Sequence, residues 1–272
     1  MSFSLFTELV YPLILVAALP GSIDGELTDS DAKHPERKTP MDSHDFETDI
    51  RQLLTVTLRP TGSHLDTILI LTGPSGQAYQ NDDAPGGEGG SMLRVITPEE
   101  GPWTATVTAY GEDSRGPYRL SIETQDVKRI MRERGELTDD DHTLLKLGEK
   151  ADIVELDITK GESYLVQQIS GMFTPFLAVH VDGKIYTNSY SEALPNGSQV
   201  FFTAQADGKA KLVLTSSSPE GRGLYGMRVF QTLPREEVET AEEPVGAEKE
   251  QAITPEELEE LEELEELEEA EE

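Results

Sequence analysis

The sequence predicts an all-β protein made of two tandem, jelly-roll-like β-sandwiches, and two observations lead to this prediction. The first is an internal repeat with a spacing of about 107 residues, and the second is a series of short β-branched or aromatic segments separated by turn residues. A spacing this long is too large for the units of a solenoid, so each repeat is expected to be a whole domain.

The chain begins with an apolar run from Leu9 to Leu19. The run is too short to span a bilayer core of about 30 Å and has the length typical of a signal-peptide core. Small residues at Ala17 and Ala18 offer a cleavage region, whereas the first residues carry Glu8 and no Lys or Arg. We expect residues 1–20 to be a signal peptide-like segment, and a secreted, periplasmic or cell-surface location. A buried strand or a misassigned start codon is the alternative.

The repeat is clearest where Gly25-Glu-Leu-Thr-Asp-Ser-Asp31 recurs as Gly135-Glu-Leu-Thr-Asp-Asp-Asp141. Four further anchors keep nearly the same separation: Gly76 with Gly183, Ser91 with Ser198, Gly101 with Gly208, and Gly116-Pro-Tyr118 with Gly223-Leu-Tyr225. They divide the chain into one sandwich over residues 21–125 and a divergent copy over residues 135–232. Residues 126–134 are expected to be a charged linker that could form a helix, and each half is expected to fold on its own.

Each copy contains short segments with the composition of strands. In the first copy these are Leu53–Leu58, Thr67–Leu71, Trp103–Tyr110 and Tyr118–Ile122; in the second they are Tyr164–Val166, Phe176–Val181, Gln199–Thr203, Lys211–Thr215 and Tyr225–Phe230. Turns are expected at Gly76 and Gly183, since glycine readily adopts a positive φ. Trp103 and Tyr110 fall on opposite faces of one strand, and core packing is the expected role of Trp103.

The net charge of −31 disfavours a nucleic-acid partner, because phosphates would be repelled, and favours divalent cations or basic partners. The chain has no cysteine, which excludes disulfides, thiolate zinc sites and cysteine nucleophiles. Its five histidines are scattered, and no zinc helix, nucleophile elbow or phosphate-binding loop is present. The sequence therefore predicts a protein that is not an enzyme.

Residues 233–272 form an acidic, Glu-rich tail. Thr254, Pro255 and Glu257 have the pattern of a helix start. The leucines from Leu258 to Leu267 recur at every third residue, so they spread around a helix and form no heptad seam. The tail is expected to be solvated; recruitment of a basic partner or loose binding of cations is the alternative.

Residues 45–124 carry an ordered series of motifs. These are Asp45-Phe-Glu47, Leu65-Asp-Thr-Ile-Leu-Ile-Leu71, Pro74-Ser-Gly76, Asn81-Asp-Asp83, Gly86-Gly87 with Ser91, Pro98 to Gly101, and Gly116-Pro-Tyr-Arg-Leu120. The series resembles the bacterial pre-peptidase C-terminal domain, a β-sandwich module appended to secreted peptidases and other exported proteins. The second half looks like a divergent copy that keeps the framework. The resemblance implies a non-catalytic binding or accessory role.

One candidate metal site follows from the acids of the first copy: Asp66, Asn81, Asp82 and Asp83. Brought together, these oxygen ligands would suit Ca²⁺, and some relatives in the resembled family bind calcium. The second copy has Thr174 in place of Asp66 and Asn188-Ser-Tyr190 in place of Asn81-Asp-Asp83, so no counterpart is expected there. The alternative is that the Asn-Asp-Asp loop only caps turns.

The predicted function is an exported, non-catalytic binding or accessory module, stabilised by calcium if the metal site is real, that contacts an extracellular protein or polysaccharide. No transmembrane span is expected, and the oligomeric state stays open. One alternative is a structural envelope or assembly protein that acts through its acidic tail. Another is an enzyme with an unrecognised site.

Overall fold

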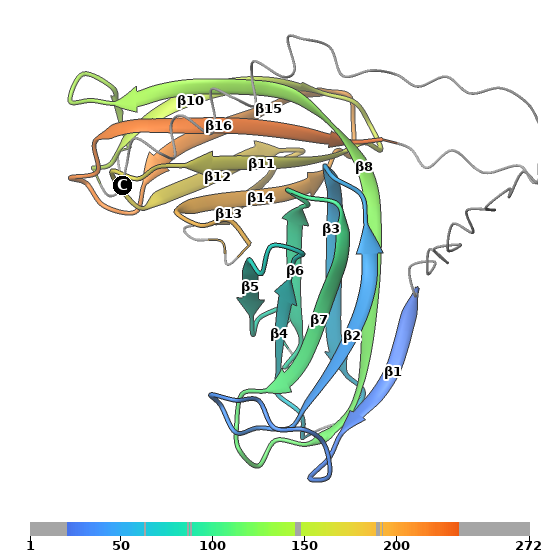
Figure 1. Cartoon of the computed structure of the whole chain (residues 1–272). Helices are drawn as coiled ribbons and strands as arrows, with labels where there is room; N and C mark the ends of the chain where they lie inside the picture. The colour runs from blue at the N-terminus through green and yellow to red at the C-terminus, as the bar shows by residue number, and fades with distance from the viewer. Residues whose placement is uncertain are drawn as a thin grey trace, which may run out of the picture. The chain divides into compact units, whose positions relative to one another are not determined.

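The computed structural model describes residues 21–233, apart from residues 63, 86, 88, 145–147, 189–190 and 192. The described residues form sixteen β-strands and no helix, which confirms the predicted all-β class (Figure 1). Within this part of the chain, no helix has the length and apolar character needed to span a bilayer. The signal peptide-like segment and the tail beyond Leu233 lie outside the described residues.

Eight strands build the first half. They are β1 (Ser22–Leu27), β2 (Met41–Thr48), β3 (Gln52–Pro60), β4 (Thr67–Thr72), β5 (Ala78–Asn81), β6 (Ser91–Ile96), β7 (Gly101–Ala109) and the beginning of β8 (Gly116–Leu137). All pairings are antiparallel, and they give one sheet with the order β1-β8-β3-β6 and a second with the order β2-β7-β4-β5.

The second half starts with the end of β8. It continues with β9 (His142–Thr143), β10 (Lys150–Ile158), β11 (Ser163–Ile169), β12 (Pro175–Val181), β13 (Lys184–Asn188), β14 (Gly197–Thr203), β15 (Gly208–Ser216) and β16 (Gly223–Thr232). One sheet has the order β8-β16-β11-β14, and the other has the order β10-β15-β12-β13 with the short β9 beside β10.

Both halves have the strand order of a jelly roll. If the main strands of each half are counted from one to eight, both have the sheet orders 1-8-3-6 and 2-7-4-5. The register also repeats: Val56 pairs with Leu93 and Ile122, and Val166 pairs with Val200 and Val229 at the corresponding positions. The repeat found in the sequence is therefore a repeat of pairing register.

Alternation along the strands explains the two cores. In β7, Trp103, Ala105 and Val107 are fully buried, and the Trp103 ring stacks on Tyr79 with centroids 6.2 Å apart. Tyr110, just beyond the strand, is 63% exposed. The expectation that Trp103 packs in the core is confirmed. The predicted turn glycines also have positive φ, with 87° at Gly76 and 71° at Gly183.

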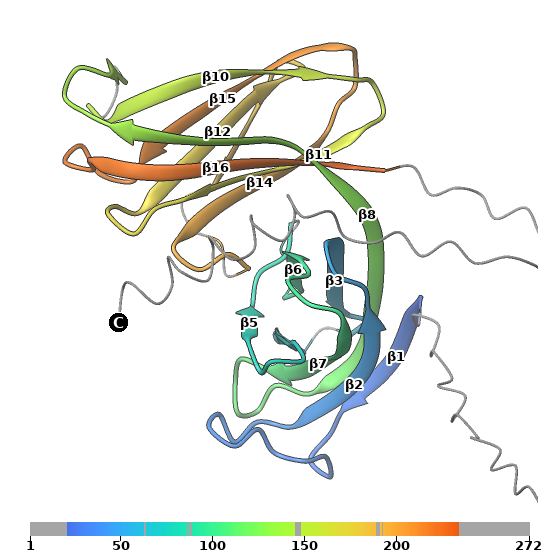
Figure 2. The same cartoon turned by 45° about the horizontal axis from the view of Figure 1, so that its top comes forward.

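The prediction that residues 126–134 form a linker is wrong. These residues are the middle of β8, which has 22 residues and runs from the first half into the second (Figures 1 and 2). The beginning of β8 pairs with β1 and β3, and its end pairs with β16. The strand is thus the eighth strand of one jelly roll and the first strand of the next. This shared sheet counts against the expectation that each half folds on its own.

A small apolar cluster joins the halves beside this strand. Leu53 of β3 packs with Leu165 of β11 and Phe230 of β16, all buried, and with the partly buried Ile96, Val127 and Phe201. Leu165 and Phe230 are register partners, next in alternation to the inward-facing Val166 and Val229. They therefore lie on the outer face of the second sandwich, which explains how residues outside its core become buried.

We expect a flexible Gly-Ser-Gly-Ser insertion between Asp126 and Val127 to split heat unfolding into two transitions, measured by calorimetry. Each large apolar side chain in the cluster contributes about 1.5–3 kcal/mol by burial, and the insertion uncouples these contacts. The same insertion after Asp113, in the turn before β8, is the control and should leave the transition undivided. An undivided transition in both variants would show that β8 continuity does not couple the halves.

Candidate functional site

The four residues of the predicted calcium site lie on two connections of the first half. Asp66 is exposed and directly precedes β4, where its backbone N–H donates to Ser114 Oγ at 2.9 Å. Asn81 ends β5, and Asp82 and Asp83 follow it as exposed residues. In the described part of the chain, no group of three or more His, Cys, Asp or Glu side chains could hold a metal ion. The calcium site stays a prediction.

Asn81 caps the turn that follows it. Its side-chain amide donates to the carbonyl oxygens of Asp83 and Met92, both at 2.8 Å, and its Oδ1 accepts the N–H of Asp83 at 3.2 Å. The Met92 N–H also donates to the Asp83 carbonyl at 2.9 Å. These contacts are those of the turn-capping alternative. In the second half, Asn188 pairs with Leu177 as Asn81 pairs with Leu69.

The other replacements in the second copy are placed only in part. Thr174 is exposed and directly precedes β12, as Asp66 precedes β4. Ser189 and Tyr190 lie outside the described residues.

Asn81→Ala should lower the free energy of unfolding by about 1–3 kcal/mol, because three hydrogen bonds of the turn are lost. The turn-capping contacts predict the same loss in millimolar calcium and in chelator, measured by denaturant unfolding. A loss that appears only when calcium is present would instead support the metal site.

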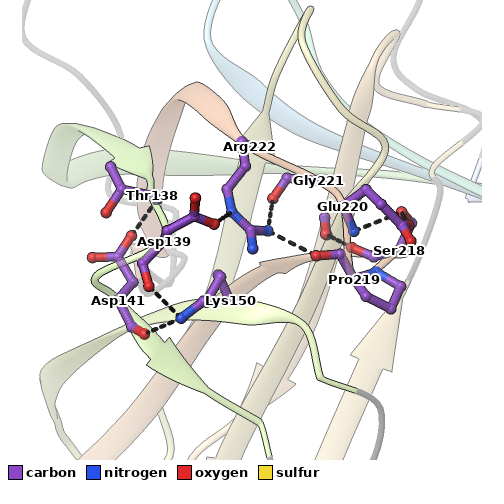
Figure 3. Close-up of polar contacts among 10 residues, drawn as sticks. Thr138, Asp139, Asp141, Lys150, Ser218, Pro219, Glu220, Gly221 and Arg222 are labelled. Carbon is purple, nitrogen blue, oxygen red and sulfur yellow. Dashed lines mark hydrogen bonds and ion pairs between the residues drawn. The ribbon is translucent and has the colours of Figure 1, made fainter.

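The repeated acidic segments form two loops with the same internal contacts. In the second half, Asp141 Oδ2 accepts the N–H of Thr138 at 2.6 Å, and Arg222 Nε donates to Asp139 Oδ1 at 2.9 Å (Figure 3). Lys150 Nζ donates to the carbonyl oxygens of Asp139 and Asp141. The acids of this loop therefore hold the chain in place around cationic side chains.

The first half repeats the aspartate and arginine contacts, though not those of Lys150. Asp31 Oδ2 accepts the N–H of Thr28 at 2.6 Å, and Arg115 Nε donates to Asp29 Oδ1 at 2.9 Å. Since the ion pairs are exposed, each contributes little to stability. Their equivalence shows that the conserved spacing of the two segments reflects loop geometry.

A tyrosine beside each loop links the two sheets of its sandwich. Tyr118 in β8 donates its hydroxyl to Asp42 Oδ2 in β2 at 2.7 Å, and Tyr225 in β16 donates to Asp152 Oδ2 in β10 at 2.5 Å. Gly25 is the register partner of Tyr118, and a Cβ at Gly25 would lie 2.4 Å from the ring.

Burial, together with the neighbouring aspartates, raises the pKa of Tyr118 and of Tyr225 far above the usual value of 10.0. His44 Nε2 lies 2.9 Å from the Tyr118 hydroxyl, whereas the second half has Val154 at the equivalent place. Each tyrosine hydroxyl donates to an aspartate of the facing sheet, so this group is a structural link.

Tyr225→Phe should lose about 1.5–3 kcal/mol of unfolding free energy near pH 8, because a hydrogen bond to a charged acceptor is removed. Since the folded pKa of Tyr225 is raised, the wild type has this stability in full below pH 10 and loses it as the pH rises above 10. The variant should therefore lose less stability than the wild type between pH 9 and pH 11, measured by denaturant unfolding.

Tyr110→Phe is the control for this prediction, because Tyr110 is 63% exposed. It should match the wild type at both pH values. Equal alkaline losses in Tyr225→Phe and the wild type would show that Tyr225 titrates normally.

A cavity of about 330 Å³ lies where the two halves meet. Its described lining is Asn81, Asp83, Pro85, Met92, Leu93 and Arg94 from the first half and Leu165, Asn188, Ser191, Ala193, Gln199 and Phe201 from the second. The volume falls at the lower end of the range for small-molecule sites, about 300–1,000 Å³. Asn81 and Asn188, which are equivalent in the two copies, both reach this cavity.

Contacts across the junction position the cavity's side chains. The Arg94 guanidinium lies over the Phe201 ring, 4.4 Å from its centroid, and burial lowers the pKa of Arg94. Gln199 Nε2 donates to the Arg94 carbonyl at 2.9 Å. Gln199 Oε1 accepts a hydrogen bond from Gln167 Nε2 at 3.1 Å. Asp83 is the one carboxylate among the described lining residues.

No family model and no curated protein matches the sequence. Among solved structures, the chain is similar to the M60 catalytic domain with two CBM51 domains of Clostridium perfringens ZmpB, with 7% identity over 72% of this chain and 34% of that one and a TM-score of 0.25. It is also similar to a protein of Sulfolobus Turreted Icosahedral Virus, with 12% identity over 71% of this chain and 56% of that one and a TM-score of 0.21.

A third similar structure is the infectious bursal disease virus VP2 subviral particle, with 11% identity over 78% of this chain and 74% of that one and a TM-score of 0.23. The chain thus spans about a third of the length of the ZmpB structure. Similarities this distant carry no argument about function. The resemblance to the pre-peptidase C-terminal domain stays a prediction.

The cavity was not predicted from the sequence, because none of its lining residues indicates a binding site when taken alone. Arg94, Gln199 and Phe201 lie at outward-facing positions of strands β6 and β14, next to buried neighbours. The sequence signal available was an arginine, Arg94, and a phenylalanine, Phe201, at outward positions of their strands. The residues that contact Arg94 lie more than a hundred residues away in the other half, so the signal does not reveal them.

Proposed function

We propose that the chain is a non-catalytic binding module that acts outside the cytoplasm and holds a segment of a polysaccharide in the junction cavity. The observation that carries this proposal is the cavity's lining, in which amide groups from both halves, the Asp83 carboxylate and the Arg94 guanidinium line one space beside the Phe201 ring. Sugars present many hydroxyl groups, and such polar side chains bind hydroxyls by hydrogen bonds.

A binding role is favoured over catalysis by the same lining. General acid and base catalysis of glycoside cleavage uses two carboxyl groups. Asp83 alone supplies a carboxylate among the described lining residues, and no described histidine lies there. The fixed position of Arg94 over Phe201 favours a preformed site that loses little entropy on binding.

Asp83→Ala should weaken binding to polysaccharides at least tenfold, measured by affinity electrophoresis on gels that contain a panel of neutral and acidic polysaccharides. The Asp83 backbone forms the turn contacts with Asn81 and Met92, so replacing its exposed side chain should leave the fold intact. Asp82→Ala is the matched control, because Asp82 is the exposed neighbour and does not line the cavity.

Retardation of the wild type by a polysaccharide, with Asp82→Ala behaving alike and Asp83→Ala migrating freely, is the expected result. Equal retardation of all three proteins would place binding elsewhere. Free migration of the wild type on every gel would contradict the proposed function.

A further inference from the structure

The end of β8 has an open edge. Strand β8 pairs with β3 on one side from Tyr118 to Asp126 and with β1 on the other side from Gly116 to Ser121. From Val127 to Leu137 it pairs with β16 alone, so no other described strand lies along its second edge. An unpaired edge offers backbone N–H and C=O groups to an added strand.

Arginines lie along one face of this edge. Arg132 and Arg134 are two residues apart, so they lie on the same face, and both are exposed. The register partner of Arg132 is Arg228 in β16, and the partner of Arg134 is Gly226, which has no side chain to cover it. The side chains of Arg132, Arg134 and Arg228 make no hydrogen bond or ion pair in the part of the chain that the structure describes.

The arginines repel one another. Burial, together with the charges of Arg132 and Arg129, lowers the pKa of Arg228. Such a group of positive charges is unusual in a chain with a net charge of −31, and an added carboxylate would relieve the repulsion. The face is the outer one, because the neighbouring Met227 and Val229 point into the core.

The other face of the edge has a different charge. Glu133 is the register partner of the core residue Met227, so its exposed side chain points to the side opposite Arg132 and Arg134. Glu136 follows on the arginine side, beyond Arg134. A strand added beside this edge would therefore meet Arg132 and Arg134, with Glu136 beyond them, on one face and Glu133 on the other.

We propose that the edge of β8 from Met131 to Leu137 accepts an extended segment of a partner protein that carries acidic side chains at every second position. Main-chain hydrogen bonds join the segment to β8, and its acidic side chains lie across from Arg132 and Arg134, where cross-strand pairs of opposite charge are favourable. Its alternate positions are uncharged, because they face Glu133. This second site goes beyond the proposed polysaccharide site, since none of these residues lines the junction cavity.

The probe is a fluorescent eight-residue peptide that alternates Glu with Thr, and binding to the full chain is followed by anisotropy. Binding should weaken at least tenfold in the double variant Arg132→Ala with Arg134→Ala. The matched control is Arg51→Ala with Arg59→Ala, because these residues are also two exposed arginines, in the first half. The control should bind as the wild type does, and heat unfolding checks that both variants fold.

A second probe tests strand addition without changing the protein. Two further peptides carry N-methyl groups, one on every Thr amide and the other on every Glu amide. Each keeps the charge of the original peptide and loses the main-chain N–H donors along one of its edges. One of the two methylated peptides should lose binding at least tenfold. Equal binding of all three peptides would overturn strand addition.

The partner's chemistry is tested by competition. A peptide that alternates Lys with Thr should not bind, and polygalacturonate should displace the Glu-Thr peptide only at a higher carboxylate concentration than unlabelled peptide does. More effective displacement by polygalacturonate would assign the edge to an acidic polysaccharide and overturn the proposal. Asp83→Ala should leave peptide binding unchanged, so failure here and failure of the polysaccharide site are distinguishable.

Discussion

Strand β8 is a continuous backbone that contributes a strand to both sandwiches, and the arrangement of the described chain depends on this constraint. Its beginning supplies the last strand of one jelly roll, and its end supplies the first strand of the next. Because side chains alternate along a strand, the core-facing positions of β8 would keep one parity, yet Tyr118 and Leu120 face the first core and Leu137 faces the second. The shift occurs opposite Val229 and Phe230, where Ile130 of β8 has no partner in β16. Both the apolar cluster around Leu53 and the junction cavity lie beside it.

The sequence predicted the fold well because local signals agreed with one another. The repeat, the β-branched segments and the turn glycines all point to strands, and the recurrence of Gly25 with Tyr118 as Gly135 with Tyr225 reflects one packing rule. Each glycine leaves room for a tyrosine ring that links the two sheets through an aspartate. Such a pair can be detected in a sequence because the glycine and the tyrosine recur together in both copies.

The linker and the cavity could not be predicted for a different reason. Residues 126–134 contain many charged residues, which is typical of a solvated segment, yet an exposed strand beside a junction has the same composition. Arg94 and Phe201 meet only because two sandwiches are joined at a particular register, and no local pattern encodes that contact. The Asn81 loop shows the opposite case, since its residue types suit both a metal and a turn, and only the hydrogen bonds favour the turn.

The distribution of charge gives the shared strand a further role. Residues 21–125 carry 18 acidic and 8 basic side chains, and residues 135–232 carry 13 and 8, so the two halves repel each other. Residues 126–134, between them, carry four basic and two acidic side chains. A positive segment between two negative bodies lowers the repulsion where they approach most closely, because screened charges act over about 10 Å. The arginines of β8 thus contribute to the joining of the halves, and the positive potential that remains at the open edge is what an acidic strand would meet.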